Sequence, residues 1–376
     1  MRGLPALSVI VPAWNEAQWL PHTLAALQQA LADVDRRTEI IVVDNASTDS
    51  TPQIAQQAGC RVVFEPERRI SRARNAGARA ARGRVLLFLD ADVTLGQDWR
   101  THLPRALARL SGPEPVVTGS LCVPPATDGS WIERHWFENK AQRVRDDTTY
   151  LGTAHMLVRR DVFLELGGFD ESLRTGEDFD LCRRARRRGG KVAPVPALRA
   201  VHRGFPRSIR AFVRREAWHG SGDTGTWRAI GRSKVALATL AFLGAHLLMA
   251  FGLVFLGPVA VAFGGASLMG VLLLSCLGRS RGTPAASLPF TLALYYFYFV
   301  GRTLSFLPRP PARPARAGEV ITGASFAGGD PRAPRRRRRS FGRVSRIQWR
   351  ARRPSGSRER SSRRARGRPS RRAYRE

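Results

Sequence analysis

Cysteine is scarce in this sequence. Its 376 residues include four cysteines, at positions 60, 122, 182 and 276. They lie far apart and show no paired spacing, which argues against a cysteine zinc cluster or a disulfide framework and fits a reducing compartment. Residues 1–7 carry one arginine and lead directly into an apolar segment. They are too short for the core and cleavage site of a signal peptide, so we expect the main domain to stay in the cytoplasm.

Acidic residues are also few: 30 Asp and Glu stand against 62 Lys and Arg, for a formal net charge of +32. Residues 308–376 hold 23 arginines and only four acidic residues, so most of the excess lies at one end. This tail is poor in apolar residues, and we expect it to be disordered. Its arginines lack the interleaved aromatic residues of specific recognition, so no specific nucleic-acid partner is expected. Adsorption to nucleic acid or to anionic lipid stays open.

The first hundred residues predict an α/β fold with a doubly wound sheet. Three short runs rich in Val, Ile and Leu have the composition of buried parallel strands: 7–13, 38–44 and 84–90. Three segments have helical spacing: 20–31, 51–58 and 71–81. In such sheets ligands bind beyond the carboxyl ends of the strands, which is where Asn15, Asp44, Asp90 and Asp92 fall.

The main domain is expected to cover residues 1–225. Between 116 and 220 the strand and helix signals are mixed, with a strand predicted over 152–160 and a helix over 177–189. We expect this part to complete the same domain and to shape the site of a second substrate.

Two long apolar segments follow the main domain. Residues 235–256 and 259–277 are almost wholly apolar and are long enough to cross a bilayer. Lysine and arginine flank the pair on both sides, which by the positive-inside tendency places both flanks in the cytoplasm. We therefore expect a membrane region over 233–307, located in the inner (cytoplasmic) membrane with the main domain facing the cytoplasm.

A third apolar segment, residues 285–307, leaves two interpretations open. It contains Pro289, three tyrosines and Arg302, so its unbroken apolar core is short for a full crossing. A crossing would place the arginine-rich tail outside, against the positive-inside tendency. An interfacial or re-entrant segment would keep the tail inside, and we favour this arrangement.

Four polar motifs occur in order, each at the end of a predicted strand or the start of a predicted helix. They read PAWNE, DNASTD, DAD and GED, at 12–16, 44–49, 90–92 and 176–178. In this order they resemble the inverting glycosyltransferases of family 2, which have the GT-A fold, a Rossmann-like nucleotide-diphospho-sugar transferase fold. The resemblance covers residues 5–220. It implies a hexosyltransferase-type enzyme that moves a sugar from a nucleotide-diphosphate donor to an acceptor hydroxyl with inversion.

The DAD motif predicts a site for a divalent cation. A departing nucleotide diphosphate develops negative charge, and a hard ion such as Mg²⁺ or Mn²⁺ held by carboxylates compensates it. The resemblance implies that Asp92 is the more direct ligand and that Asp90 lies nearer the ribose. The alternative is that both aspartates only cap the following helix. His202 matches a third metal ligand of some family members, although a lone histidine is usually structural.

The donor side is carried by the first two motifs and by one helix. The resemblance implies that Pro12, Asn15 and Glu16 form the first donor-binding loop and that Asp44 contacts the base or ribose. The alternative role for Asn15 is to cap the helix that follows. The second loop reads Asp-Asn-Ala-Ser where Asp-Asp-Gly-Ser is commoner, so the contact to the base is expected to differ. Asn75, in RARNAGARA, matches a helix near the nucleotide.

The acceptor side requires a general base for the attacking hydroxyl. The GED motif resembles the family's Glu-Asp pair, which implies that Asp178 is this base; Glu177 has the alternative of capping the following helix. The resemblance also places Gly152 and Thr153 on an acceptor-side strand. Trp218 falls where related enzymes carry an acceptor-side loop.

The apolar segments favour an acceptor in or at the bilayer, either a lipid-linked saccharide or another cell-envelope glycan. Transfer directly to a polyprenyl phosphate is the alternative within this class. A nucleotidylyltransferase shares the sheet and the metal but usually begins with a glycine-rich phosphate loop, which LSVIVPAWNE lacks.

Overall fold

The computed structural model describes residues 6–32, 38–126, 129–138, 148–224, 230–231, 233–280 and 287–307. All of these residues belong to one unit of the chain, Met1–Glu319. The predicted disorder of residues 308–376 lies outside the described residues.

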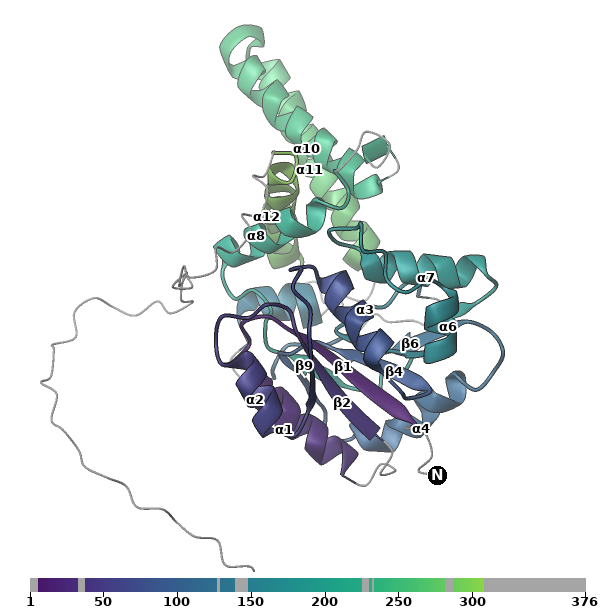
Figure 1. Ribbon diagram of the computed structural model, residues 1–376. Coiled ribbons are helices and arrows are strands. Elements are labelled where there is room, and N and C mark those ends of the chain that lie inside the picture. The colour runs from purple at the N-terminus through teal and green to yellow at the C-terminus, as the bar shows by residue number, and fades with distance from the viewer. Residues whose placement is uncertain are drawn as a thin grey trace, which may run out of the picture. The chain divides into compact units, whose positions relative to one another are not determined.

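A seven-stranded sheet forms the centre of the domain, in the order β3-β2-β1-β4-β7-β6-β8 (Figure 1). The strands are β1 Leu7–Ala13, β2 Thr38–Asp44, β3 Arg61–Phe64, β4 Val85–Leu89, β6 Val116–Gly119, β7 His155–Arg159 and β8 Lys191–Pro194. Strands β1 to β4 are parallel, and β7 runs antiparallel between β4 and β6. The predicted strands at 7–13 and 38–44 are confirmed residue for residue, whereas the strand predicted over 152–160 forms only at 155–159.

Helices cover both faces of the sheet because the central strands are apolar on both sides. They are α1 Leu20–Leu31, α2 Thr51–Gln57, α3 Ile70–Ala80, α4 Trp99–Arg109, α6 Arg160–Glu165 and α7 Glu177–Arg187. Helices α1, α2 and α4 pack in one core, and α3, α6 and α7 pack in the other. Gly77 lets α3 lie close to the sheet, since a Cβ there would overlap Ile10. The predicted α/β fold, with helices on both faces of the sheet, is confirmed.

Helix α8, Ile209–Gly220, replaces the loop that we expected around Trp218. Its helical register is fixed by a buried stripe that includes Phe212, Glu216 and Gly220, and Ser208 caps it by accepting a hydrogen bond from Ala211 N. A short π-helix, η1 (Glu133–Glu138), lies against the same region through Trp136, whose ring meets Phe212 edge to face.

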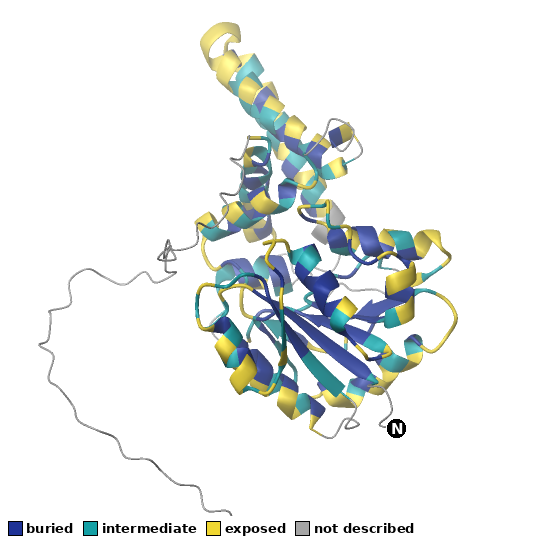
Figure 2. Ribbon diagram, viewed as in Figure 1, coloured by how far each residue is buried: buried dark blue, intermediate teal, exposed yellow. Residues whose placement is uncertain are grey.

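Two apolar helices follow. Helix α10 (Lys234–Phe251) continues as η2 (Gly252–Leu256), and α11 (Pro258–Ser280) packs against α10. By length and composition, Lys234–Leu256 and Pro258–Leu277 are able to cross a membrane, close to the predicted spans. Figure 2 shows that most of their surface is exposed or intermediate, and large apolar side chains make up much of it. A large exposed apolar surface of this kind indicates contact with an apolar environment such as a membrane or an apolar protein surface.

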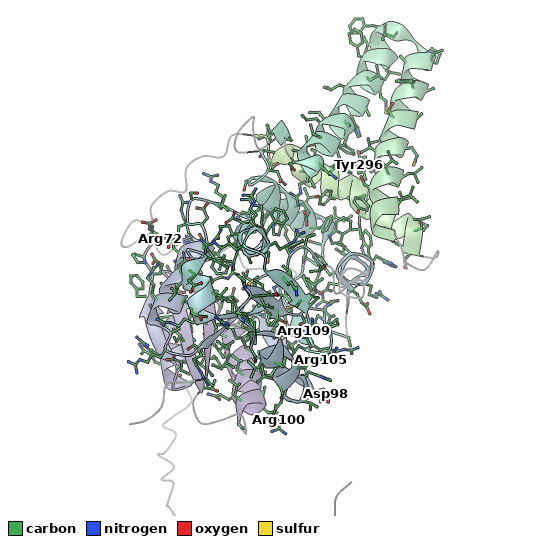
Figure 3. All side chains as sticks on the ribbon, turned by 90° about the vertical axis from the view of Figure 1, so that its right-hand side faces the viewer. Arg72, Asp98, Arg100, Arg105, Arg109 and Tyr296 are labelled. Carbon is green, nitrogen blue, oxygen red and sulfur yellow. The ribbon has the colours of Figure 1, made fainter. Side chains whose placement is uncertain are left out.

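The third apolar segment forms helix α12, Leu288–Leu304. It packs against α8, α10 and α11. Tyr296, labelled in Figure 3, points from α12 toward α10, where its hydroxyl lies 3.4 Å from His246 Nε2. At 17 residues α12 is shorter than the two candidate spans.

Candidate active site

Three predicted ligands come together after strand β4. The ligand atoms of Asp90, Asp92 and His202 all lie within 4.8 Å of one another. The chain turns after Asp92 into β5 (Val93–Leu95), which pairs antiparallel with β9 (Ala200–His202) so that Val93 faces His202 in the register. This two-stranded sheet is the physical reason that a histidine 110 positions downstream meets the DAD motif.

The donor set fits a divalent cation. His202 Nε2 lies 3.3 Å from Asp92 Oδ1, and within the described part of the chain its buried Nδ1 has no hydrogen-bond partner. Carboxylate oxygens suit Mg²⁺ and Mn²⁺, and imidazole is a common third ligand of divalent cations. The triad is therefore consistent with a divalent cation.

Gly204 makes room for the Asp92 carboxylate. A Cβ on Gly204 would overlap Asp92 Oδ2 and approach the His202 ring. The backbone N–H of Arg203 also donates to the Asp92 carbonyl at 3.0 Å. The turn after β9 thus wraps around Asp92, and a glycine is required at its closest point.

Negative charge is concentrated around this triad. The pKa of Glu16 is raised to about 8, most by burial and then by the nearby charges of Asp92, Asp90 and Asp49. Burial also raises the pKa of Asp92, against a smaller lowering by His202. Carboxylates that repel one another in a partly buried place are stabilised by a bound cation.

Arg74 joins the DAD and GED motifs. Its guanidinium is buried and donates to Asp90 Oδ1 and to Glu177 Oε1, both at 2.7 Å. Burial disfavours its charge, but Asp90 and Glu177 outweigh this and raise the pKa of Arg74. The guanidinium of Arg74 lies between the two carboxylates. It fixes the start of α7, and with it Asp178, relative to the end of β4.

The first two motifs are hydrogen-bonded to each other. Asn15 Oδ1 accepts from Thr48 N at 2.8 Å, and Asn15 N donates to Ser47 Oγ at 3.1 Å. Glu16 N and Ala17 N donate to Thr51 Oγ1 and Asp49 Oδ2. Asn15 has φ 55°, a left-handed conformation that asparagine tolerates. Its side chain therefore ties the two loops together and is not the N-cap of α1, which is Trp19.

The other predicted donor residues are built into the walls of the site. Asp44 is buried and accepts from Ser47 N at 3.0 Å, which shapes the second loop. Pro12 is buried within β1 opposite Val43. Asn75 donates to Phe169 O and to Glu171 Oε1 and accepts from Phe169 N, so its carboxamide holds the Gly-Gly-Phe-Asp-Glu turn.

The predicted acceptor-side residues meet at the start of α7. A Cβ on Gly152 would lie 3.7 Å from Asp178 Oδ2, so this backbone runs beside the candidate base. Thr153 is buried, and Asp90 N donates to Ala154 O at 3.3 Å. The segment 152–154 therefore lies between the Asp90 side and the Asp178 side of the site.

The end of helix α8 contacts the loop that precedes α7. Thr175 Oγ1 donates to His219 O at 3.1 Å, two residues before Glu177, and Gly222 packs on the Thr175 side chain. Trp218, on the last turn of α8, is 45% exposed and stacks edge to face on His219. The end of α8 thus supports the loop that carries Asp178, with an exposed indole beside it.

A buried polar chain supports the site from beneath, and sequence reasoning missed it. Trp99 Nε1 donates to His155 Nε2 at 2.8 Å, and His155 Nδ1 lies 3.2 Å from the backbone N–H of Ser120 and 3.0 Å from Ser120 Oγ. Ser120 Oγ in turn donates to Leu198 O. Burial lowers the pKa of His155 to about 3. The sequence neighbours of His155, Ala154 and Met156, give no indication that its side chain takes part in a buried hydrogen-bond chain.

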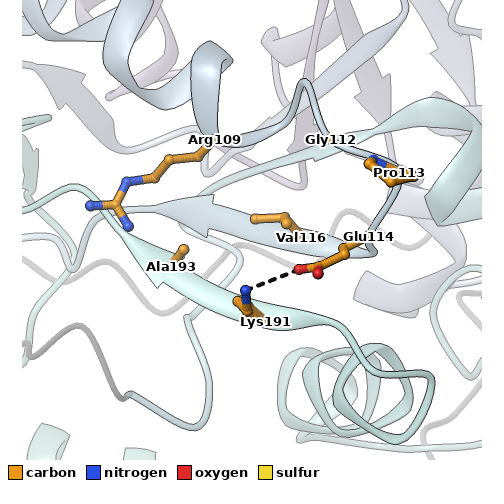
Figure 4. A pocket seen from close by; sticks show the side chains of 7 residues that line it. All are labelled: Arg109, Gly112, Pro113, Glu114, Val116, Lys191 and Ala193. Carbon is orange, nitrogen blue, oxygen red and sulfur yellow. Dashed lines mark ion pairs between the residues drawn. The ribbon is translucent and has the colours of Figure 1, made fainter.

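A cavity of about 400 Å³ lies elsewhere, between β6 and β8 (Figure 4). It is lined at the amino ends of these strands by Val116 and Lys191, and Lys191 Nζ lies 3.1 Å from Glu114 Oε2. Because β6 is parallel to β4, this cavity opens at the sheet edge opposite to Asp90. It takes no part in the site described above.

The fold and the metal-ligand triad define the class of GT-A glycosyltransferases, and comparison with known proteins gives the family. The model of "Glycosyl transferase family 2" matches residues 8–167, and that of "Glycosyl transferase family group 2" matches residues 128–300. An uncharacterized glycosyltransferase of Mycobacterium tuberculosis is 30% identical over 195 residues, 50% of this chain and 83% of that protein. The chain belongs to glycosyl transferase family 2, and it is a transferase.

Two further proteins are similar over longer stretches. Glycosyltransferase AglE of Haloferax volcanii is 28% identical over 233 residues, 60% of this chain and 75% of that protein. The structure of the mannosyltransferase PcManGT from Pyrobaculum calidifontis, in complex with GDP-mannose and Mn²⁺, matches with a TM-score of 0.53 and 21% identity, covering 81% of this chain and 88% of that one. At this level of identity, the similarity to the mannosyltransferase shows a shared fold.

Proposed function

We propose that the protein transfers a sugar from a nucleotide-diphosphate donor to a hydroxyl group of a lipid-linked or cell-envelope acceptor, with inversion at the anomeric carbon. One observation carries this proposal. A cation-binding triad, Asp90, Asp92 and His202, is connected through the buried Arg74 to the Glu177–Asp178 pair. Donor activation and base catalysis then share one rigid frame.

The donor lies along the loops after β1, β2 and β4. Asn15, Glu16 and Asp44 line the ends of β1 and β2, and Pro12 and Asn75 support these walls. Asp90 faces the ribose side of the nucleotide. Asp92 and His202 hold the divalent cation, which when bound offsets the negative charge that develops on the departing diphosphate. The Mn²⁺ in the complex of the Pyrobaculum mannosyltransferase supports this choice of ion class.

Asp178 is the general base. As the acceptor oxygen forms its bond to the anomeric carbon, the bond from that carbon to the diphosphate oxygen breaks on the opposite face. The hydroxyl proton goes to the Asp178 carboxylate, whose Oδ1 also accepts from Phe179 N at 2.7 Å. Glu177 forms an ion pair with Arg74 at 2.7 Å and holds the base in place. Gly152, Thr153 and the exposed Trp218 border the acceptor.

The acceptor is presented at a membrane. The apolar helices α10 and α11 follow the catalytic domain directly, and Ser233 at the start of α10 donates to Asp223 just beyond α8 at 3.0 Å. The start of the first span is thus fixed next to the helix that supports the Asp178 loop. We place the catalytic domain on the cytoplasmic face of the inner membrane, where nucleotide sugars are made. A polyprenyl phosphate is the second candidate acceptor.

The experiment that tests the proposal offers a panel of radiolabelled nucleotide sugars to membranes that contain the protein. We expect one donor to label extractable lipid or glycan in the presence of Mn²⁺ or Mg²⁺, with the opposite anomeric configuration in the product. Added lipid phosphate and added lipid-linked saccharide separate the two acceptor classes. Membranes that contain Asp92→Asn or Asp178→Asn protein are the negative controls. Equal labelling with these variants, or retention of configuration, would contradict the proposal.

A further inference from the structure

Helix α12 has two different apolar faces. One face is buried and includes Thr291, Leu294, Tyr295, Phe299 and Gly301. The other face carries an apolar stripe at intervals of three and four residues, which places its members on one side of the helix. We call it the α12 stripe: Phe290, Ala293, Phe297, Val300 and Leu304. Phe290 and Leu304 are 46% and 41% exposed, and Leu307, just beyond the helix, is 59% exposed. No polar residue interrupts this stripe.

The buried face of α12 packs against η1 and α8 of the catalytic domain and against α10 and α11. Near the start of α12, Tyr295 meets Trp136 of η1 edge to face at 5.0 Å between ring centroids, and the edge of the stripe also touches η1, where Phe290 stacks on His135 at 4.4 Å. Near its end Gly301 packs against the backbone of α8, where a Cβ would lie 2.7 Å from Val213 O. The two ends of the helix are therefore held by two elements of one domain.

Charged groups anchor the same interface. Arg302 donates to Asp223 Oδ2 at 2.9 Å and to Glu216 Oε2 at 3.2 Å. On the outside of α8, Arg210 and Arg214 are exposed one turn apart. If α12 crossed the bilayer, it would draw α8 and these charges into the hydrocarbon, which strongly disfavours them. Helix α12 is about 25 Å long at about 1.5 Å per residue, which is also short of a bilayer core of about 30 Å.

We propose that α12 lies in the plane of the membrane, with the α12 stripe inserted at the boundary between headgroups and acyl chains of an anionic bilayer. The helix α12 packs directly on the first apolar helix, because Phe242 of α10 contacts Tyr296 and Phe299 of α12. Arg210 and Arg214 on the neighbouring helix supply the positive charge that anionic headgroups attract.

Two consequences follow for the enzyme. The chain leaves α12 at Leu307 on the same side of the membrane as the catalytic domain. The interfacial helix also seats α8 at headgroup level, and α8 contacts Thr175 beside the candidate base. The inference rests on the membrane insertion of α10 and α11 stated under the proposed function, and it adds the orientation of the site toward the lipid surface.

Depth-dependent fluorescence quenching tests this arrangement. Single cysteines replace Phe290, Phe297 or Leu304 in the full chain with its four native cysteines changed to serine, and each carries an environment-sensitive fluorophore. The proteins are reconstituted in vesicles of phosphatidylcholine and phosphatidylglycerol that contain spin-labelled lipid, with the label near the headgroup or near the chain end. Met269→Cys, an exposed position within α11, reports on the membrane span, and Asp98→Cys, exposed on the catalytic domain, is the matched aqueous control.

We expect all three α12 positions to be quenched about twofold more by the shallow label than by the deep label, as for a helix in the interface, while Met269→Cys shows the reverse order. Strong deep quenching at Phe297→Cys with shallow quenching at both ends would mean that α12 crosses the bilayer, and would overturn the inference. Quenching at Met269→Cys but at no α12 position would overturn it as well and leave the two spans intact. Absence of quenching everywhere would overturn both the inference and the membrane anchoring.

Discussion

The carboxylate of Asp90 lies 2.7 Å from the guanidinium of Arg74, and the other terminal nitrogen of that guanidinium lies 2.7 Å from Glu177. The buried guanidinium of Arg74 therefore holds the proposed metal ligands and the proposed base at a fixed separation. The inversion that we propose requires such a frame, because donor and acceptor must be aligned on opposite faces of one carbon.

Replacing Arg74 by Met should damage both stability and catalysis. The change leaves Glu177 buried without its cation, and loss of one partner of a buried pair costs about 3–5 kcal/mol of unfolding free energy. Sugar transfer should fall by at least about tenfold, equal to about 1.4 kcal/mol. Arg79→Met is the control on the same helix, because Arg79 is 59% exposed and lies 3.5 Å from Glu171. Equal thermal stability and activity of the two variants would contradict the bridging role.

Replacing Gly204 by Ala should weaken metal binding without removing a ligand. The new Cβ overlaps Asp92 Oδ2, so the carboxylate must move. We expect about a tenfold higher dissociation constant for Mn²⁺, about 1.4 kcal/mol, measured from the free-ion signal in electron paramagnetic resonance. Gly112→Ala meets nothing within 4 Å and should bind as the wild type does. A Gly204→Ala protein with unchanged affinity would show that Asp92 does not bind the ion.

His155 should make the fold sensitive to acid. Burial lowers the pKa of His155 in the folded protein to about 3, whereas in the unfolded chain its pKa is the ordinary histidine value of 6.5. Between these values the unfolded state holds more protons, so stability falls as the pH falls, by up to about 1.4 kcal/mol per pH unit. His155→Gln removes this proton uptake. Its stability deficit relative to wild type, from thermal unfolding in detergent, should shrink below about pH 6.5; a deficit that stays constant down to pH 4 would refute the assignment.

Replacing Gly301 by Ala should separate α12 from α8. The Cβ would lie 2.7 Å from Val213 O, and backbone atoms cannot yield cheaply. Overpacking of this kind costs about 1–3 kcal/mol, and transfer should slow because α8 supports Thr175. Gly265→Ala in α11 meets nothing within 4 Å and should be neutral or stabilising by about 0.5–1 kcal/mol. If both variants melt and turn over alike, the α8–α12 contact does not support the site.

Much of the fold was predictable because local patterns and tertiary structure agree. The apolar runs 7–13 and 38–44 are buried strands, and the helix predicted over 20–31 is α1. The antiparallel placement of β7 and the α8 helix were not predictable. Strand direction depends on pairing with β4 and β6, and α8 forms because α12, distant in sequence, covers its apolar face.

The candidate site was predictable where motifs follow strands and not where distant segments meet. Asp90, Asp92 and His202 come together as the motifs indicated. The close approach of Gly204 and the buried partners of His155 depend on packing across the sheet, which no local pattern encodes. Asn15 and Asn75 form hydrogen bonds to neighbouring loops, and their contact with the donor stays a prediction.

The most direct test measures Mn²⁺ binding and sugar transfer in the same membrane preparation for Asp92→Asn and Asp178→Asn, with the exposed Asp98→Asn as control. We predict that Asp92→Asn loses both activities. Asp178→Asn should keep metal binding and lose transfer by about 10²–10⁴-fold, the range of general-base catalysis. Transfer at the wild-type rate by both variants would contradict a mechanism in which a cation near Asp92 and a base at Asp178 act on one donor.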